Sequence, residues 1–425
     1  MPAYTIRLFF LAVFLPGLAI AQPTKLEAQR NVLERIIRDN KNDFGPWATA
    51  PADYDVQVIY TQIERDKDGR PRLTSHRWGV DGSEYFYPAS TVKMPTALLA
   101  LEKVHRLGLP GVDRDTYLRT GAGRAPQTPA LVDESAPNML PSVGHYARKI
   151  FLTSDNDAHN RLYEFLGQAE LNMGLREHGF NRSRIIHRLS VSGFDTLGNR
   201  YANPVSLLRG GDTLAYYRGE QYSMLYDDFD LTDQVRGKGY LDDATNEVVM
   251  QPFDFRYKNY LSVQDLHDMV RAIVLPESVA AERRFDLGPG DYEHVWRAMG
   301  SFPRESGIED YADLADNYVK FWMYGDKDTS TVIPDQIRIF NKVGWAYGYL
   351  TDAAYIVDLA TGVEFLLVGT IHVNRNEIYN DGKYEYDEVG LPFFGQLGRA
   401  VYEYEVRQKR GKPGKLGPAA ELFRR

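Results

Sequence analysis

The chain has 425 residues, a formal net charge of −8 at pH 7 and no cysteine. This length allows one large domain or two smaller ones, and the mild acidity argues against nucleic-acid binding. Without cysteine the chain has no disulfides, no thiol catalysis and no thiolate or iron–sulfur centres.

The first residues have the layout of a secretory signal peptide. Residues 1–7 form a singly basic start, 8–18 an apolar stretch, and Ala19-Ile20-Ala21 a small-x-small cleavage pattern. We predict that residues 1–21 are removed near Ala21, which places the mature protein in the periplasm or outside the cell. No later stretch approaches the ~20 apolar residues of a membrane span, so we expect a soluble mature chain.

Periodicity and composition predict helices and strands along most of the remaining chain. The predicted helices are 24–40, 94–104, 142–151, a run after Asn156 that stops at Gly167, 262–275, 294–299 and 394–407. The predicted strands are 54–63, 73–80, 336–346, 353–359 and 363–373. Pro95 lacks an N–H donor and therefore predicts an irregularity early in the second helix.

The segments between these elements predict irregular structure. Residues 107–141 read as an extended surface loop, 184–204 as a second loop, and 210–258 as an insertion into the domain. The basic tail, about 411–425, is predicted to be solvated and flexible. The alternative for this tail is contact with an anionic envelope surface.

Strands at both ends of the chain and helices in its middle predict an α+β fold. One antiparallel sheet would be built from both termini and flanked by helices. A helical lobe over about 85–205 would be inserted into it. We expect one catalytic domain over 22–410.

Ser90 and Lys93 stand at the head of the buried helix, three residues apart and therefore on one face. A serine hydroxyl is a weak nucleophile until a base takes its proton. A lysine can serve as that base only where burial or a nearby cation lowers its pKa. Apolar neighbours favour burial, so the pair is a candidate nucleophile and base. The alternative is a helix cap followed by a surface lysine.

Two further motifs follow in order, Ser154-Asp155-Asn156 and Lys342-Val343-Gly344. With the string Tyr87-Pro88-Ala89-Ser90-Thr91-Val92-Lys93, they resemble the penicillin-recognising serine enzymes, and most closely the class A β-lactamase-like serine hydrolases. Residues 154–160, whose Asn160 matches the family's loop-anchoring asparagine, and 345–348 extend the likeness. It covers roughly 54–204 and 262–407.

This resemblance implies a β-lactamase/transpeptidase-like fold and an acyl-enzyme mechanism on an amide, ester or β-lactam. Ser90 would attack the carbonyl carbon, with Lys93 as its base. Ser154 would pass a proton to the leaving group, aided by the charge of Lys342. Lys342 would also discourage protonation of Lys93.

The resemblance also assigns substrate-binding residues. Asn156 would bind the substrate amide and help to hold Lys93. The backbone amides of Ser90 and Trp345 would bind the oxyanion beside Gly344. Lys342 would in addition offer a cation to a substrate carboxylate.

Two departures from the family pattern bear on turnover. Residues 184–204 contain no glutamate to activate a deacylating water, and their only carboxylate, Asp195, is better explained as a loop-stabilising side chain. Val343 replaces a hydroxyl residue that helps to bind the antibiotic carboxylate. Three alternatives stay open: a β-lactamase with an unusual deacylation residue, a D-Ala-D-Ala-type peptidase or esterase acting on envelope material, and a penicillin-binding pseudoenzyme without turnover.

Other classes of chemistry lack their signatures. The histidines show no metal-ligand spacing, and the chain has neither a phosphate-loop lysine motif nor a G-x-S-x-G elbow. We therefore predict no metal and no cofactor, and a small molecule or peptide, β-lactam or peptidoglycan-like, as the substrate. The aromatic residues around the third motif are core residues or candidates for pocket walls. They are Trp322, Tyr324, Trp345 and Tyr347.

Overall fold

The computed structural model describes residues 31–226, 229–308, 311–409 and 415–424. The predicted signal peptide lies outside these residues. None of the helices in the described ranges has the length and apolarity needed to cross a bilayer.

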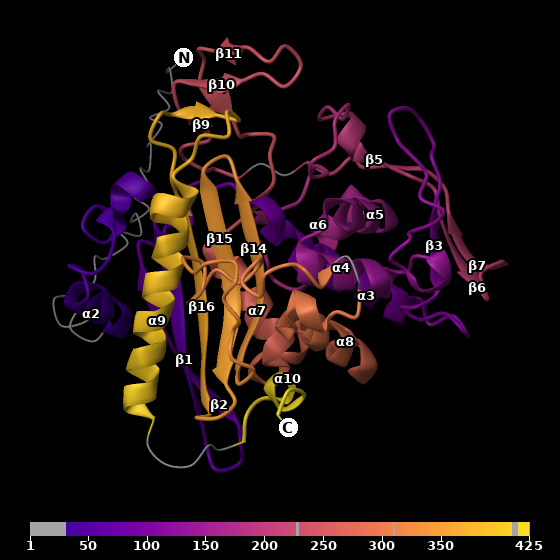
Figure 1. Cartoon of the computed structure of the whole chain (residues 1–425). Helices are drawn as coiled ribbons and strands as arrows, with labels where there is room; N and C mark the ends of the chain where they lie inside the picture. Colours follow the sequence, from indigo (N-terminus) through magenta and orange to yellow (C-terminus); the bar gives the residue numbers. More distant parts are fainter. Residues whose placement is uncertain (1–30, 227–228, 309–310, 410–414, 425) are drawn as a thin grey trace, which may run out of the picture.

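A five-stranded antiparallel sheet forms the centre of the molecule (Figure 1), with strand order β14-β15-β16-β1-β2. Its strands are β1 Gln57–Arg65, β2 Pro71–Trp78, β14 Ile337–Ala346, β15 Tyr349–Asp358 and β16 Val363–His372. The last three strands of the chain lie directly beside the first two, so both termini build the sheet, as predicted. β15 begins four residues earlier than predicted because the turn before it contains only Tyr347 and Gly348, both at positive φ.

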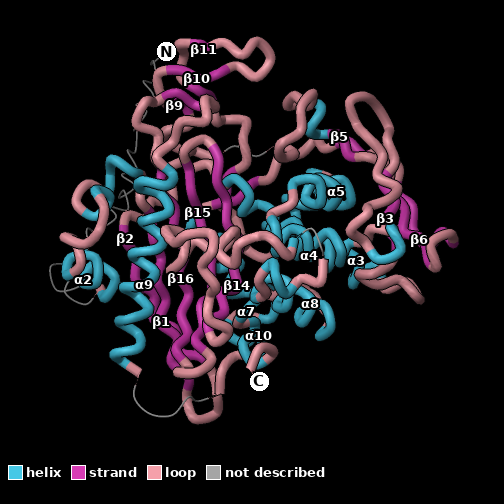
Figure 2. The backbone as a smooth tube through the Cα atoms, in the orientation of Figure 1, coloured by secondary structure: helices cyan, strands magenta, loops and turns pink. Residues whose placement is uncertain are grey.

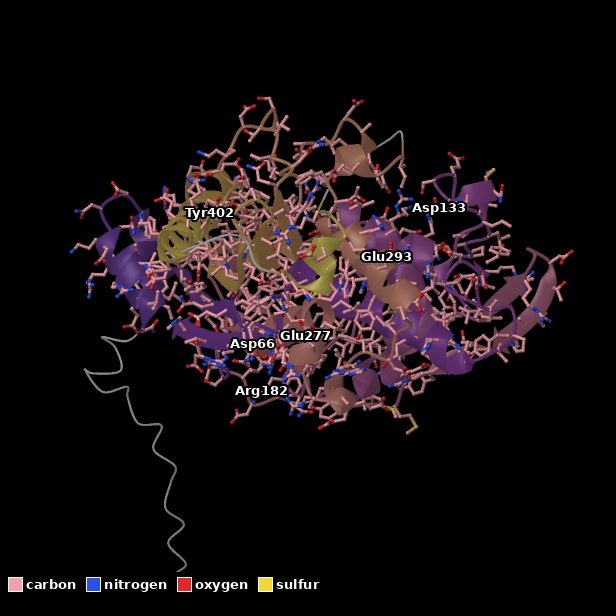
Figure 3. The ribbon with its side chains drawn as sticks, turned by 90° about the horizontal axis from the view of Figure 1, so that it is seen from below. Asp66, Asp133, Arg182, Glu277, Glu293 and Tyr402 are labelled. Carbon is pink, nitrogen blue, oxygen red and sulfur yellow. The ribbon has the colours of Figure 1, made fainter. Side chains whose placement is uncertain are left out.

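The two faces of the sheet carry different layers. Helices α9 (Leu391–Gln408) and α2 (Val32–Asp39) cover one face, while α7 (Val263–Val274) and the helical lobe cover the other (Figures 1 and 2). Figure 3 shows Tyr402 of α9 and Asp133 of the lobe far apart, on the left and right of the molecule. Side chains alternate between the layers, so that Val343 joins the core beneath α9.

The helical lobe contains α3 (Lys93–Leu107), α4 (Val143–Thr153), α5 (Asn156–Leu166), α6 (Gln168–Glu177) and α8 (Pro289–Gly300). Helix α3 is its central helix, because every residue from Lys93 to Val104 is buried. Pro95 lies in the first turn of α3, where its missing donor breaks no helical bond. The irregularity predicted at Pro95 occurs just before it, as the 3₁₀ turn Ala89–Val92.

Two of the predicted loops contain strands. Residues 107–141 include β3 (Tyr117–Thr120), which pairs with β6 (Val205–Arg209) and through it with β7 (Thr213–Arg218). The remaining short strands are β4 Ser183–Arg184, β5 Tyr201–Ala202, β8 Gln221–Tyr222, β9 Val235–Arg236, β10 Gly239–Leu241, β11 Val248–Val249, β12 Phe253–Asp254, β13 Tyr260–Leu261 and β17 Ile378–Tyr379. Strand β10 lies parallel to β17, which ties the insertion to the C-terminal part of the domain.

The prediction of a flexible C-terminal tail is wrong for residues 415–424. Helix α10 (Pro418–Glu421) is preceded by the buried Leu416, and both Ala419 and Ala420 are fully buried. The ring of Phe423 packs edge-on against Phe340 of the sheet, 5.5 Å between centroids. Basic composition suggested solvent exposure, but the apolar residues interspersed among the charges are the ones that pack.

A chain that ends at Lys415 should be less stable by about 2 to 4 kcal/mol, because it leaves the surface under α10 exposed to water. Urea unfolding followed by circular dichroism measures this difference. Arg424→Ala, which removes only a partly exposed side chain, is the control and should match the wild type. Equal midpoints for the truncated and full-length chains would show that α10 contributes nothing to stability.

Candidate active site

Ser90 lies in the tight 3₁₀ turn Ala89–Val92, directly before α3. Ala89 adopts a φ of +45°, a strained conformation for a residue with a side chain. The hydroxyl and the backbone N–H of Thr91 both donate to Pro88 O, and the backbone N–H of Lys93 donates to Ser90 O. These bonds hold the turn in which Ser90 is presented.

Lys93 is fully buried one turn after Ser90 and points at the second motif. Its Nζ donates to Ser154 O, to Asn156 Oδ1 at 2.6 Å and, more weakly, to Ser154 Oγ at 3.3 Å. Burial lowers the pKa of this ammonium to about 7, against a smaller opposing effect from Asp155. No hydrogen bond joins the side chains of Ser90 and Lys93 within the described part of the chain.

The second motif forms the junction between two helices. Ser154 ends α4 with a φ of +58°, Asp155 caps α5 by accepting from the N–H of Ala158 at 2.7 Å, and Asn156 is the first residue of α5. Lys342 Nζ donates to Ser154 Oγ at 2.8 Å. The hydroxyl of Ser154 therefore lies between the amines of two buried lysines.

Lys342 reaches this hydroxyl from β14, on the sheet face that carries the helical lobe. It is buried, and its Nζ also donates to Val343 O at 2.8 Å. Burial, followed by the positive charge of Lys93, holds the pKa of Lys342 well below its usual range. Lys342 does not line the cavity described below, so the expected contact with a substrate carboxylate does not follow from this geometry.

Gly344 allows the edge of β14 to pass close to the nucleophile turn. A Cβ at this position would lie 2.5 Å from Pro88 O and 2.8 Å from the backbone nitrogen of Ser90. Ala346 pairs with Tyr349 across the two-residue turn, and hydrogen-bonded pairs alternate along such a ladder. The N–H of Trp345 therefore points away from β15, toward the open edge and the Ser90 turn.

A cavity of about 1480 Å³ opens onto this edge, and Ser90, Asn156 and Trp345 line it. The loop of residues 186–196 lines it, and so do Tyr257 and Lys258 from the insertion. Loop and insertion thus both line the cavity that contains Ser90, which the sequence did not predict.

Two of the four aromatic residues considered for the pocket walls do line the cavity, namely Trp345 and Tyr347. Trp345 is 47% exposed and stacks on Phe321 at 5.5 Å. Trp322 is fully buried in the core beneath α9, where its indole N–H donates to Asp352 O. Tyr324 packs against the same core. These two are core residues because their segment crosses the sheet face opposite the cavity.

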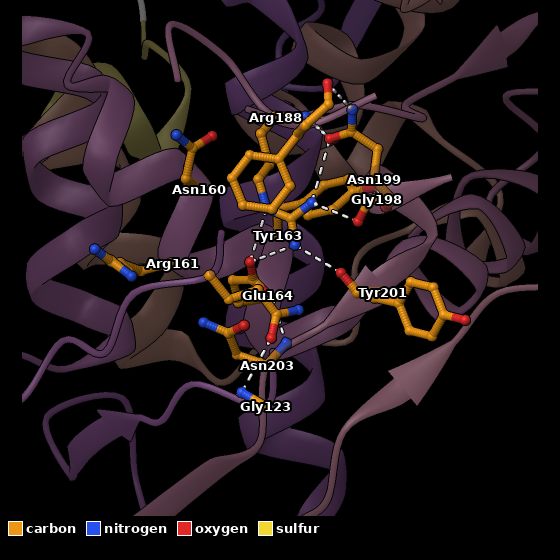
Figure 4. Close-up of polar contacts among 12 residues, drawn as sticks. Gly123, Asn160, Arg161, Tyr163, Glu164, Arg188, Gly198, Asn199, Tyr201 and Asn203 are labelled. Atoms are coloured by element: carbon orange, nitrogen blue, oxygen red, sulfur yellow. Dashed lines mark hydrogen bonds and ion pairs between the residues drawn. The ribbon is translucent and has the colours of Figure 1, made fainter. Parts of the chain in front are cut away.

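The cavity-lining loop is fixed to α5 (Figure 4). Asn160 exchanges two hydrogen bonds of 2.9 Å with the backbone of Leu189. One oxygen of the Glu164 carboxylate accepts from Arg188, at 2.5 and 2.7 Å, and the other accepts from the N–H of Asn203 at 2.5 Å. Both oxygens of Glu164 are therefore engaged in holding the loop.

Asp195 has a structural role in this loop. Its side chain is exposed, and its Oδ1 accepts from the N–H of Gly198 at 2.6 Å, which stabilises the following 3₁₀ turn. This contact supports the interpretation of Asp195 as a loop-stabilising residue.

Sequence reasoning missed a buried polar network behind Lys342. Lys320 Nζ donates to Asn341 Oδ1 at 2.8 Å, and Asn341 Nδ2 donates to Asp352 Oδ1 at 2.8 Å. Burial lowers the pKa of Lys320 to about 7 and raises that of Asp352 to about 6. The signal was the adjacent polar pair Asn341 and Lys342 inside a strand whose only other polar side chain is Arg338.

Gly344→Ala should slow acylation of Ser90 by roughly a hundredfold, because the new methyl group forces β14 away from the nucleophile turn. The rate of adduct formation with an activated ester measures this effect. The matched control is Gly82→Ala, where an added Cβ meets nothing within 4 Å. Wild-type rates for Gly344→Ala would contradict the close approach.

One family model matches most of the sequence. A family model described as the beta-lactamase enzyme family matches residues 52–404. No curated protein matches the sequence significantly. Similar solved structures include a β-lactamase from Sphaerobacter thermophilus, at 12% identity and a TM-score of 0.47, covering 88% of this chain and 96% of that one.

Two further structures are similar at the same level. PBP-A has 16% identity and a TM-score of 0.44 over 88% of this chain and 95% of its own. The extended-spectrum β-lactamase TLA-1 has 14% identity and a TM-score of 0.47 over 88% of this chain and 98% of its own. The family model spans far more than half of the sequence, and the chain therefore belongs to the beta-lactamase enzyme family, with its α+β fold and a serine hydrolase type of site.

Proposed function

We propose that this chain is a secreted or periplasmic serine hydrolase that forms an acyl-enzyme on Ser90 with an amide, ester or β-lactam. The observation that carries this proposal is the fully buried Lys93, one turn after Ser90. Its amine is held by Ser154 and Asn156, and its pKa is lowered to about 7. A base with a pKa near the working pH suits proton transfer from a serine hydroxyl. Secretion rests on the predicted signal peptide.

In the acylation step, neutral Lys93 accepts the proton of the Ser90 hydroxyl while Ser90 Oγ bonds to the substrate carbonyl carbon. Nζ turns for this from Ser154 O to Ser90 Oγ, a short movement within one helical turn. Catalytic hydrogen bonds often form only in the substrate complex. The negative charge on the former carbonyl oxygen is then stabilised by the N–H groups of Ser90 and Trp345.

Collapse of the tetrahedral intermediate breaks the bond to the leaving nitrogen or oxygen. Ser154 donates its hydroxyl proton to that atom, and the proton is replaced from Lys93 through the 3.3 Å contact between them. Lys342, which holds the same hydroxyl at 2.8 Å, keeps it oriented. Lys93 thereby returns to its neutral form.

Deacylation needs a base for water, and the described residues offer no free carboxylate beside Ser90. Glu164 is bound by Arg188 and Asn203, and Asp195 is exposed and caps a turn. These contacts favour a long-lived acyl-enzyme, as in a D-Ala-D-Ala-type peptidase or esterase acting on envelope material, over rapid β-lactam hydrolysis. A penicillin-binding pseudoenzyme is the alternative if the acyl group is never released.

Intact-mass spectrometry with a fluorescent penicillin and an activated ester should show an adduct on the mature protein and none on Ser90→Ala. The matched control is Ser192→Ala, which removes another hydroxyl from the same cavity and should leave the adduct. An adduct that survives Ser90→Ala would assign another nucleophile. A lifetime of minutes or longer would separate a slow peptidase from a β-lactamase.

The acylation rate should rise about tenfold between pH 6 and pH 8 and then level off, because the neutral form of Lys93 becomes the major form as the pH passes its pKa of about 7. Stopped-flow measurement with a substrate that does not titrate in this range gives the profile. Lys93→Arg, which stays protonated, should lose the reaction at every pH. A flat profile in the wild type would exclude Lys93 as the base.

A further inference from the structure

Lys258, from the insertion, lines the same cavity as Ser90. Its Nζ lies 5.6 Å from the ring centroid of Tyr347 and 5.5 Å from that of Phe253. Within the described ranges no carboxylate lies within 4.0 Å of this nitrogen, and no hydrogen bond joins it to an acceptor. Aromatic faces supply only part of the stabilisation that an ammonium loses on leaving water.

Two charged side chains near Lys258 have hydrogen-bond partners of their own. The charge of Asp243 opposes the larger effect of burial, which lowers the pKa of Lys258, but its carboxylate is bound by Asn380 Nδ2 at 2.5 Å. Arg256 forms a bidentate pair with Asp254. The charge of Lys258 is therefore available to a ligand in the cavity.

The backbone of Lys258 is fixed. Its N–H donates to Phe255 O at 3.0 Å, and its carbonyl oxygen accepts from Arg184 at 3.2 Å. The next residue, Asn259, is fully buried, and its side chain binds the backbone of Ile186 and His187 on the cavity loop. The ammonium is thus carried on a rigid support rather than on a mobile surface loop.

The position of Lys258 relative to Ser90 indicates which half of a bound substrate Lys258 would contact. Lys342 of β14 lies beside Ser154, Gly344 lies beside Ser90, and Tyr347, the first residue of the turn after β14, lies beneath Lys258. At ~3.3 Å per residue, Lys342 and Ala346 at the end of β14 are roughly 13 Å apart, and Gly344 beside Ser90 lies between them. Because Ser154 protonates the leaving group, the leaving half extends toward Lys342 and the acyl half extends toward Tyr347.

We propose that Lys258 binds an anionic group, such as a carboxylate, on the acyl half of the substrate, which stays on the enzyme after the leaving group departs. This inference rests on the proposed acylation of Ser90 and adds a substrate class to it. An anion at this position gives the ammonium of Lys258 a charged partner, in addition to the two aromatic rings that it contacts. Charge-assisted hydrogen bonds of this kind are roughly twice as strong as neutral ones.

The test compares two esters with one leaving group. Mono-p-nitrophenyl suberate carries a free carboxylate at the far end of its acyl chain, and its counterpart carries a neutral primary amide there. The rate of p-nitrophenol release in the first turnover, corrected for hydrolysis in buffer, gives the acylation rate per molar substrate for each ester. Intact mass verifies that Ser90 carries the acyl group.

The wild type should prefer the carboxylate ester by about tenfold. Lys258→Met should lose this preference while keeping its rate with the amide ester, and Lys258→Arg should retain most of it. Lys238→Met is the charge-matched control, because Lys238 is exposed and pairs with Glu377, and it should behave as the wild type. An unchanged rate with the amide ester also shows that Lys258→Met is folded.

Two results would overturn the inference: equal rates with both esters in the wild type, or a preference that persists in Lys258→Met. Absence of any Ser90 adduct with either ester and with the fluorescent penicillin would instead overturn the proposed acylation, and the inference with it. Acylation of Ser90 by both esters without discrimination would leave the proposed function standing and exclude Lys258 as the specificity residue.

Discussion

The site depends on the close approach of the β14 edge to the Ser90 turn. Only a glycine at position 344 leaves room for it, since a single added carbon would overlap Pro88 O and the Ser90 nitrogen. This approach brings Lys342 onto Ser154 and turns the N–H of Trp345 toward the nucleophile. One contact between the sheet and the helical lobe therefore aligns three motifs that are far apart in the chain.

Removal from water lowers the pKa values of the lysines in and behind these motifs. Lys93, Lys320 and Lys342 are all buried, and burial is the largest influence on the pKa of each. For Lys93 the lowered pKa corresponds to roughly 5 kcal/mol against the charged form. Ser154, Asn156 and Asn341 offset part of this cost with oxygen atoms directed at the amines. The fold thus keeps these amines away from bulk water, where they would stay protonated and unreactive as bases.

The loop of residues 186–196 and the insertion supply much of the cavity lining outside the three motifs. The loop of residues 186–196 is held to α5 by the Glu164–Arg188 pair and by Asn160, and the insertion contributes Lys258 to the cavity lining. Ser90 and Asn156 of the three motifs line this cavity, together with the two segments that differ most from the family pattern. Family membership therefore says more about the type of site than about which acyl group the cavity would accept.

The sequence by itself determined the order of the elements, the sheet built from both termini and the residues of the three motifs. Apolar periodicity and the short spacing between Ser90 and Lys93 are properties of residues close together in the sequence. They can therefore be recognised without the tertiary structure. Only the tertiary structure decided that Lys342 is buried against Ser154, that Trp322 belongs to the core, that residues 415–424 pack on the domain and that Lys258 lines the same cavity as Ser90. Those outcomes depend on contacts between residues that are distant in sequence. Burial and charge pairing are set by the residues that pack against a side chain, and local composition does not reveal which residues those are.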